Sequence, residues 1–154
     1  MITIQKSKRR LTVTGKNGET LLVCAVMLGS SPKGKKTAEG DGRTPEGTYR
    51  ICTVNPRSRF HAAFGLSYPN RADAQRAYIA KRVSLMTALR IAACDRLHFR
   101  PPWKTPLGGY VMIHGESPDG KTGDWTAGCV AVSNENMDKL TLLCRKGETV
   151  VIQP

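Results

Sequence analysis

The chain has 154 residues, of which 40% are hydrophobic and 23% are charged. This is the size of one ordinary domain, and the composition is sufficient to bury a hydrophobic core. No apolar run approaches the roughly 18 residues that span a membrane, and no apolar stretch follows the basic first ten residues as in a signal peptide. We therefore expect one domain over residues 1–154 with no membrane span. The domain is either cytoplasmic or exported, by another route or with a leader that has been removed.

The formal net charge is +12 at pH 7. The excess of Lys and Arg lies within the first 100 residues, whereas residues 101–154 are nearly balanced. Such a surface suits a polyanionic partner, such as an anionic membrane or cell-wall polymer, or it is a solvated surface with no partner. The sequence has no RNA-binding aromatic motif, zinc-finger spacing or basic heptad region, so we do not expect nucleic acid as a partner.

Five cysteines are present, an odd number, and none of them belongs to a CxxC pair. This pattern indicates neither a disulfide framework nor a metal site. Cys24, Cys52, Cys94 and Cys144 lie in apolar-leaning segments and are expected to be small buried hydrophobic residues. Cys129 has a different setting, between glycine and a short apolar run.

The first half of the chain predicts strands and loops. An Asn-Gly turn signal separates strands expected at 11–14 and 20–28, which favours a hairpin. Residues 29–47 form a long loop rich in Gly, Pro and Lys, and such a loop in a compact domain is often functional. The next expected elements are a strand at 48–54 and an irregular segment at 55–70.

The second half contains the one long helical stretch. Apolar residues recur at roughly helical spacing over residues 72–99, which predicts one or two helices that end before Pro101. The other expected elements are a strand at 109–113, a polar loop at 116–125, a strand at 129–132, a helix at about 134–143 with Ser133 as N-cap, and a strand at 149–153. Many short strands and few helices indicate a mostly β fold with peripheral helices.

The segments that carry chemistry are His114-Gly115 and Thr126-Ala127-Gly128-Cys129. A cysteine becomes a nucleophile when a base or a positive neighbour removes its proton, and a histidine within hydrogen-bond reach can do so. Adjacent antiparallel strands would bring His114 and Cys129 together. Gly128 would leave backbone N–H groups free to bind an oxyanion. Without further support, this argument is weak, and Cys129 is better explained as one more core cysteine.

These segments resemble the signature of the L,D-transpeptidase (YkuD-type) family, in which a His-Gly is followed, after a loop, by Ser/Thr-x-Gly-Cys. Residues 39–49, with Thr44-Pro45-Glu46-Gly47, resemble the family's Thr-Pro-x-Gly loop. Residues 64–70 and 124–138 are similar to a YafK-like subgroup. The resemblance covers about residues 20–152, nearly the whole chain.

The resemblance implies a mostly β L,D-transpeptidase catalytic fold and acyl transfer through a thioester, without a cofactor. The implied substrates are peptidoglycan stem peptides, cut between diaminopimelate and the terminal D-Ala. An amine resolves the thioester in a transpeptidase, and water resolves it in an L,D-carboxypeptidase. The implied location is the cell envelope or periplasm, and we expect a monomer.

The resemblance also assigns residues to roles. Cys129 is the nucleophile, His114 the base, and the backbone of Gly115 orients His114. Backbone N–H groups near Gly128 and Cys129 form the oxyanion hole, and Thr126 holds the loop through its hydroxyl group. Further residues are tentative substrate contacts, and these are Asp41, Arg43, Thr44, His61, Tyr68 and Trp125. For Trp125 a packing role is the simpler interpretation.

One position departs from the family pattern. Many members carry Arg two places after the cysteine, and this chain has Ala131 there. The sequence therefore does not identify the group that binds the substrate carboxylate, and Arg43 and Lys121 are candidates by charge alone. Two other functions stay open as well: a non-catalytic module that binds peptidoglycan, and an antibacterial toxin domain that uses the same chemistry.

Overall fold

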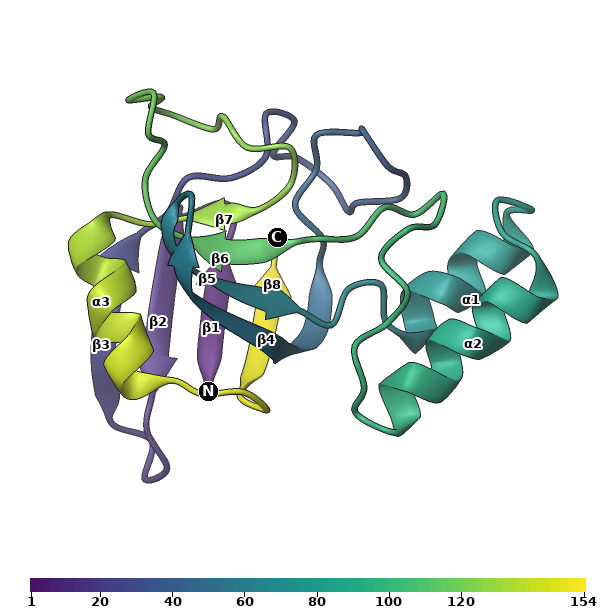
Figure 1. Ribbon diagram of the computed structural model, residues 1–154, viewed down its shortest axis with the longest axis horizontal. Helices are drawn as coiled ribbons and strands as arrows, with labels where there is room; N and C mark the ends of the chain where they lie inside the picture. The colour runs from purple at the N-terminus through teal and green to yellow at the C-terminus, as the bar shows by residue number, and fades with distance from the viewer.

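The computed structural model describes residues 1–154 as one eight-stranded sheet with three helices around it (Figure 1). The strand order is β3-β2-β1-β8-β4-β5-β6-β7. The strands are β1 (Ile2–Gln5), β2 (Arg10–Thr14), β3 (Thr20–Ala25), β4 (Gly47–Ser58), β5 (His61–Leu66), β6 (Met112–His114), β7 (Val130–Ala131) and β8 (Thr149–Gln153). The helices are α1 (Arg71–Ile79), α2 (Leu85–Arg96) and α3 (Asn134–Leu143). The expected mostly β fold with peripheral helices is confirmed.

The two ends of the chain meet in the middle of the sheet. β1 pairs in parallel with β8, and β2 and β3 form the expected antiparallel hairpin. Side chains alternate across a strand, and Ile2, Ile4, Leu11 and Val13 are accordingly buried on the inner face. These residues belong to a core cluster of 22 buried side chains.

The expectation of an irregular segment over residues 55–70 is wrong for residues 55–66 and correct for residues 67–70. β4 continues to Ser58, and His61–Leu66 forms β5, which pairs with it in antiparallel register. Pro56 had suggested the irregularity, and it lies where the register of the pair shifts between Asn55 and Ser58. Proline is tolerated in a sheet at such irregularities because no ladder hydrogen bond needs its missing N–H.

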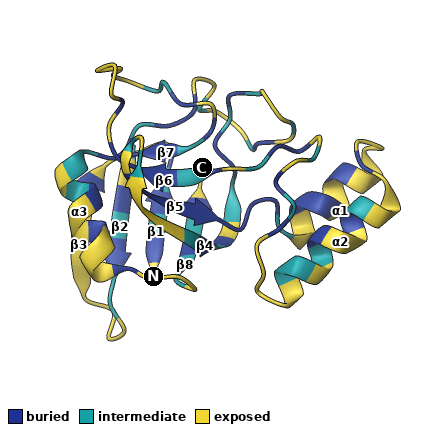
Figure 2. Ribbon diagram, in the orientation of Figure 1, coloured by how far each residue is buried: buried dark blue, intermediate teal, exposed yellow.

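The long helical stretch is two helices that form a hairpin beside the sheet (Figure 1). Asn70 and Asp73 make a capping box at the start of α1, and Ser84 caps α2. The hairpin has a small core of its own, formed by Ala74, Ala77, Val83, Ala88, Ile91 and Leu107. Its outer face is exposed (Figure 2). No helix has the length and apolar content that crossing a bilayer requires.

α3 begins after Ser133, whose hydroxyl accepts a hydrogen bond from the Asn136 N–H, as expected for an N-cap. Its buried residues Met137 and Leu140 pack into the main core. The loops 29–46 and 116–125 lie at the same end of the sheet as β6 and β7 (Figure 1). Gly29 forms an isolated bridge with Thr126, so the first loop contacts the segment that leads to Cys129.

Candidate active site

His114 lies at the end of β6, and Cys129 lies just before β7, the neighbouring strand, which runs parallel to β6. β6 ends at His114, and Cys129 immediately precedes β7, with Ile113 paired to Val130 and His114 to Ala131. The expectation of antiparallel strands is therefore wrong, because the 116–125 loop crosses back before the chain re-enters the sheet. Cys129 is level with Met112, two residues before His114, and no hydrogen bond joins Cys129 to His114.

The His114 ring is held in one tautomer. Its Nδ1 lies 2.8 Å from the Gly115 carbonyl oxygen. Because a carbonyl can only accept, Nδ1 carries the proton and Nε2 carries a free lone pair. The ring stacks on Phe60 with centroids 4.4 Å apart and packs against Trp125 at 5.6 Å. Burial lowers the pKa of His114, assisted by the charge of Arg59 and opposed by the Gly115 carbonyl, so the imidazole favours its neutral form.

Gly115 accepts no side chain at this position. A Cβ there would lie 2.4 Å from Asn134 Oδ1 and 2.6 Å from the Phe60 carbonyl oxygen. The Gly115 N–H donates to that same carbonyl at 2.9 Å. The β4–β5 turn and the start of α3 thus enclose the backbone that orients His114.

The Cys129 thiol is a half-buried group with two backbone neighbours. Its Sγ accepts from the Met112 N–H at 3.4 Å and lies 3.5 Å from the Tyr110 carbonyl oxygen. Burial raises the pKa of Cys129, and the Met112 N–H and the Lys36 charge counteract this only in part. The resting pair is therefore a thiol and a neutral imidazole. Tyr110 has a φ of 54°, a strained backbone of the kind often found at functional sites.

The other four cysteines have no such surroundings. Cys24, Cys52 and Cys144 are buried, and burial raises the pKa of Cys52 and Cys144 to about 11. Cys94 is half-buried on α2, so the expectation of a core position is only partly met there.

Two threonine hydroxyls hold the segment before Cys129. Thr126 Oγ1 donates to the Cys129 carbonyl oxygen at 2.7 Å and accepts from the Gly128 N–H at 3.1 Å. Thr44 Oγ1 lies 3.4 Å from the same carbonyl oxygen and accepts from the Gly29 N–H. The Gly128 N–H is therefore occupied, which revises the expected oxyanion hole. The Cys129 N–H makes no hydrogen bond within the protein and is free to donate.

A cavity of about 270 Å³ opens beside Cys129. Its walls come from the segments 36–40, 108–111 and 127–129. Gly128 has a φ of +136°, and a Cβ there would lie 2.7 Å from the Arg43 carbonyl oxygen. Glycine at 128 therefore allows the 29–46 loop to pack directly behind the cysteine.

None of the tentative substrate contacts lines this cavity. Tyr68 is fully buried and donates to the Leu107 carbonyl oxygen, so it cannot touch a ligand. Thr44 is also fully buried. Asp41 accepts from the N–H groups of residues 37, 38 and 43 and from Lys36, which makes it a brace of the loop.

The remaining candidates are also engaged elsewhere. His61 Nε2 lies 2.6 Å from Asp138 Oδ1, and the Arg43 guanidinium is directed to the Lys35 carbonyl oxygen. Trp125 packs on His114, which supports the packing interpretation. Lys121 lies in the exposed part of the 116–125 loop and does not line the cavity.

The residues that sequence reasoning missed are Lys36, Phe60 and Tyr110. Lys36 and Tyr110 line the cavity, and Phe60 stacks on His114. Lys36 stands in a loop with several other lysines, and nothing in the sequence distinguishes it from them. Phe60 lies in the segment that the sequence did not indicate as a hairpin.

Comparisons with known proteins identify the family of this chain. The family model of the L,D-transpeptidase catalytic domain (YkuD) matches residues 1–152. The Escherichia coli protein YafK, provisionally named an L,D-transpeptidase, is 25% identical over an alignment of 147 residues that covers 90% of this chain and 44% of YafK. The chain thus spans less than half the length of that relative.

Solved structures show the same fold. The helical cell shape determining protein Pgp2 from Campylobacter jejuni matches with a TM-score of 0.66 and 23% identity, over 98% of this chain and 46% of Pgp2. An L,D-transpeptidase from Xylanimonas cellulosilytica matches with a TM-score of 0.53 and 15% identity, over 98% of this chain and 58% of that structure. With the family model matching nearly every residue, the chain belongs to the YkuD family of L,D-transpeptidase catalytic domains.

Proposed function

We propose that this chain is a cysteine-dependent peptidoglycan acyltransferase that acts on stem peptides at the bond between diaminopimelate and D-Ala. The observation that supports the proposal best is the Cys129 thiol at the wall of a cavity, with a free N–H of its own and a single-tautomer His114 on the neighbouring strand. Family membership supports the substrate class. Because that substrate lies in the cell envelope, we place the activity there.

In the proposed acylation, Sγ of Cys129 attacks the diaminopimelate carbonyl carbon while Nε2 of His114 takes the thiol proton. The Cys129 N–H donates to the oxygen as it becomes negative. The carbon–nitrogen bond then breaks, and His114 returns the proton to the leaving amine of D-Ala. Since burial disfavours both a resting thiolate and a resting imidazolium, proton transfer accompanies the attack.

The thioester is resolved by a second nucleophile. A D-amino acid or water gives its proton to His114 as it attacks the thioester carbonyl, and the Cys129 thiolate leaves and is reprotonated. A D-amino acid needs little binding surface, whereas a 3-3 cross-link needs a second stem peptide held in place. A cavity of about 270 Å³ accommodates one peptide end. We therefore expect exchange and carboxypeptidase products before cross-links.

The test is incubation with a disaccharide-tetrapeptide, with and without D-Met, followed by separation of the products by mass. We expect a tripeptide without D-Met and a D-Met-exchanged tetrapeptide with it, and neither product from the Cys129→Ala variant. Loss of the last D-Ala from a pentapeptide with the tetrapeptide untouched would mean D,D cleavage and would refute the proposal. Binding to insoluble sacculi without any product would favour a non-catalytic wall-binding module instead.

A further inference from the structure

Two lysines of this chain are buried, and they differ in how their ammonium groups are satisfied. Lys6, with a side chain 3% exposed, donates to the carbonyl oxygens of Gly34 and Thr44 and to Glu46 Oε1. These three partners use all three of its donors. Lys6 therefore has a structural role: it joins the 29–46 loop to the sheet, and its ammonium group has no donor left for a ligand.

Lys36 has a side chain 4% exposed but only two partners. Its Nζ lies 2.8 Å from Asp41 Oδ1 and 3.0 Å from the Ala38 carbonyl oxygen. One N–H donor stays unused within the protein. Burying an ammonium group is costly unless its donors are satisfied, so an unused donor at this depth is available to bind a ligand.

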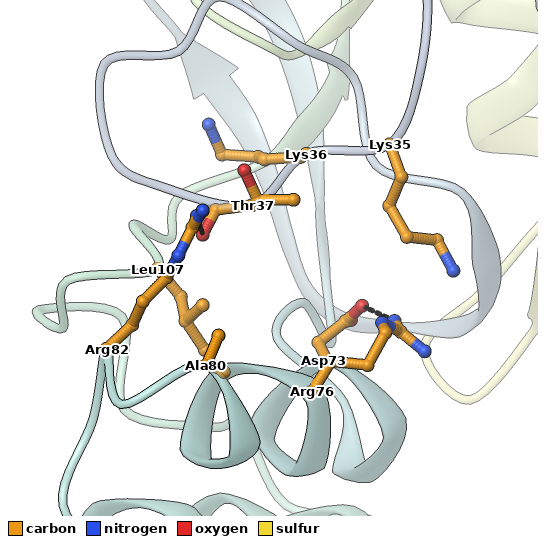
Figure 3. Close-up of a pocket in the computed structure, with 9 residues that line it drawn as sticks. Lys35, Lys36, Thr37, Asp73, Arg76, Ala80, Arg82 and Leu107 are labelled. Carbon is orange, nitrogen blue, oxygen red and sulfur yellow. Dashed lines mark hydrogen bonds and ion pairs between the residues drawn. The ribbon is translucent and has the colours of Figure 1, made fainter.

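The position of Lys36 shows where that ligand would lie. Lys36 lines the same cavity as Cys129, and a Cβ placed on Gly128 would be 3.6 Å from its Nζ. Figure 3 shows that Lys35 and Lys36 diverge: Lys35 extends toward Asp73 and Arg76, whereas the amino group of Lys36 extends away from them. Both lysines line the pocket beside Asp73 and Arg76, but only Lys36 also lines the Cys129 cavity.

We propose that the Lys36 ammonium group binds a carboxylate of the stem peptide in the Cys129 cavity. This inference rests on the proposed function and names the carboxylate anchor that Ala131 cannot supply. The α-carboxylate of the leaving D-Ala fits best, because only one amide nitrogen and one Cα separate it from the reacting carbonyl. This carboxylate therefore lies about one residue from the reacting carbonyl, a span of roughly 3.8 Å between consecutive Cα atoms. The Lys36 ammonium group lies beside Gly128, which is one residue before the nucleophile. The side-chain carboxylate of diaminopimelate is the second source of the same chemistry.

The experiment compares three substrates with the wild-type chain and two variants. The substrates are the tetrapeptide stem, its C-terminal carboxamide, and a stem amidated on the diaminopimelate side chain. The variants are Lys36→Met, which keeps the apolar stem, and the control Lys35→Met. A charge-assisted hydrogen bond is worth about 10–100-fold in binding, so we expect the wild type to lose about that factor in kcat/KM on the carboxamide.

Lys36→Met should lose the same factor on the unmodified stem, mainly through KM, and should show no further loss on the carboxamide. Lys35→Met should behave as the wild type. If the loss follows the diaminopimelate amide instead, the anchor stands and its carboxylate is that of the side chain. The wild-type comparison does not depend on the folding of any variant.

A wild-type chain that turns over all three stems equally, or a Lys36→Met variant that keeps the carboxylate preference, would overturn the inference while leaving the proposed function intact. A wild-type chain that turns over none of them refutes the proposed function, and the anchor with it.

Discussion

The two walls of the Cys129 cavity are built in different ways. One wall consists of residues 108–111 and 127–129, which lead into β6 and β7. These two strands are held by their pairing and by the fully buried side chains of Ile113 and Val130. The other wall belongs to the 29–46 loop, which contains no strand or helix and is held by the buried Lys6 and Thr44 and by the half-buried Asp41. Cys129, the proposed nucleophile, lies on the first wall, and Lys36, the cation proposed to bind substrate, lies on the second.

Because of this difference, the residues proposed to carry out the reaction and the residue proposed to bind the substrate are held by different kinds of contact. A packed sheet positions Cys129 and His114 with little freedom. A loop can also be held in place by charged groups and hydroxyls that hydrogen-bond to its backbone. When one of these side chains is lost, however, the backbone groups that it paired with are left unsatisfied. We therefore expect substitutions on the first wall to act on the chemical step, and substitutions on the second to act on binding and stability.

The largest effect is expected for Cys129→Ala, because no thioester can form without the nucleophile. A carbapenem, which resembles the acyl donor, should give no covalent adduct with this variant, as measured by intact mass. Cys94→Ala is the matched control, since Cys94 is the other half-buried cysteine, and it should acylate as the wild type does. A persistent adduct in Cys129→Ala would place the nucleophile elsewhere.

The next effect is expected for His114→Ala, which should slow acylation by about 10²–10⁴-fold, the usual worth of a positioned general base. Stopped-flow kinetics with a carbapenem measure this rate. The substitution leaves a gap between Phe60 and Trp125, so added imidazole should restore part of the rate. A near-wild-type rate without imidazole would remove His114 from the mechanism.

A change of pH should have a smaller effect than either substitution. On the acid side of the pH profile (its acid limb), the acylation rate should fall about tenfold per pH unit. Protonated His114 cannot accept the thiol proton, so activity is lost as pH falls through its pKa. Burial lowers that pKa, so the limb lies below the ordinary value of about 6.5. Arg59 also lowers the pKa of His114, and Arg59→Ala should therefore move the limb to higher pH. A limb above neutral pH in the wild type would contradict a neutral resting imidazole.

The smallest effect is expected on the loop wall, for Asp41→Ala. Removing the carboxylate leaves three backbone N–H groups and Lys36 without their acceptor, which should lower the free energy of unfolding by about 1–3 kcal/mol. Asp119→Ala, in the exposed 116–125 loop, should stay within about 0.5 kcal/mol of the wild type. Urea denaturation measures both variants, and equal stabilities would show that Asp41 does not brace the loop.

Local patterns were enough to predict much of this fold. The β2–β3 hairpin follows from an Asn-Gly turn between alternating apolar residues, and α3 follows from its Ser133 cap. The prediction for residues 55–66 was wrong because the local propensity of Pro56 is against a strand. Antiparallel pairing of β4 with β5 nevertheless makes this segment extended. The parallel pairing of β6 and β7 was missed for the same reason, since strand direction depends on the path of the connecting loop.

By itself, the sequence determined which residues are proposed to react, because His114-Gly115 and Thr126 to Cys129 form contiguous motifs that can be identified without knowing their distant neighbours. Only the tertiary structure decided which polar residues line the Cys129 cavity. It buried Tyr68 and Thr44, and it directed Lys36 into the Cys129 cavity and Lys35 away from it. The physical reason is that the orientation and burial of a loop side chain are set by contacts with segments far away in the chain, and similar lysines in one loop carry no local sign of which contact each will make.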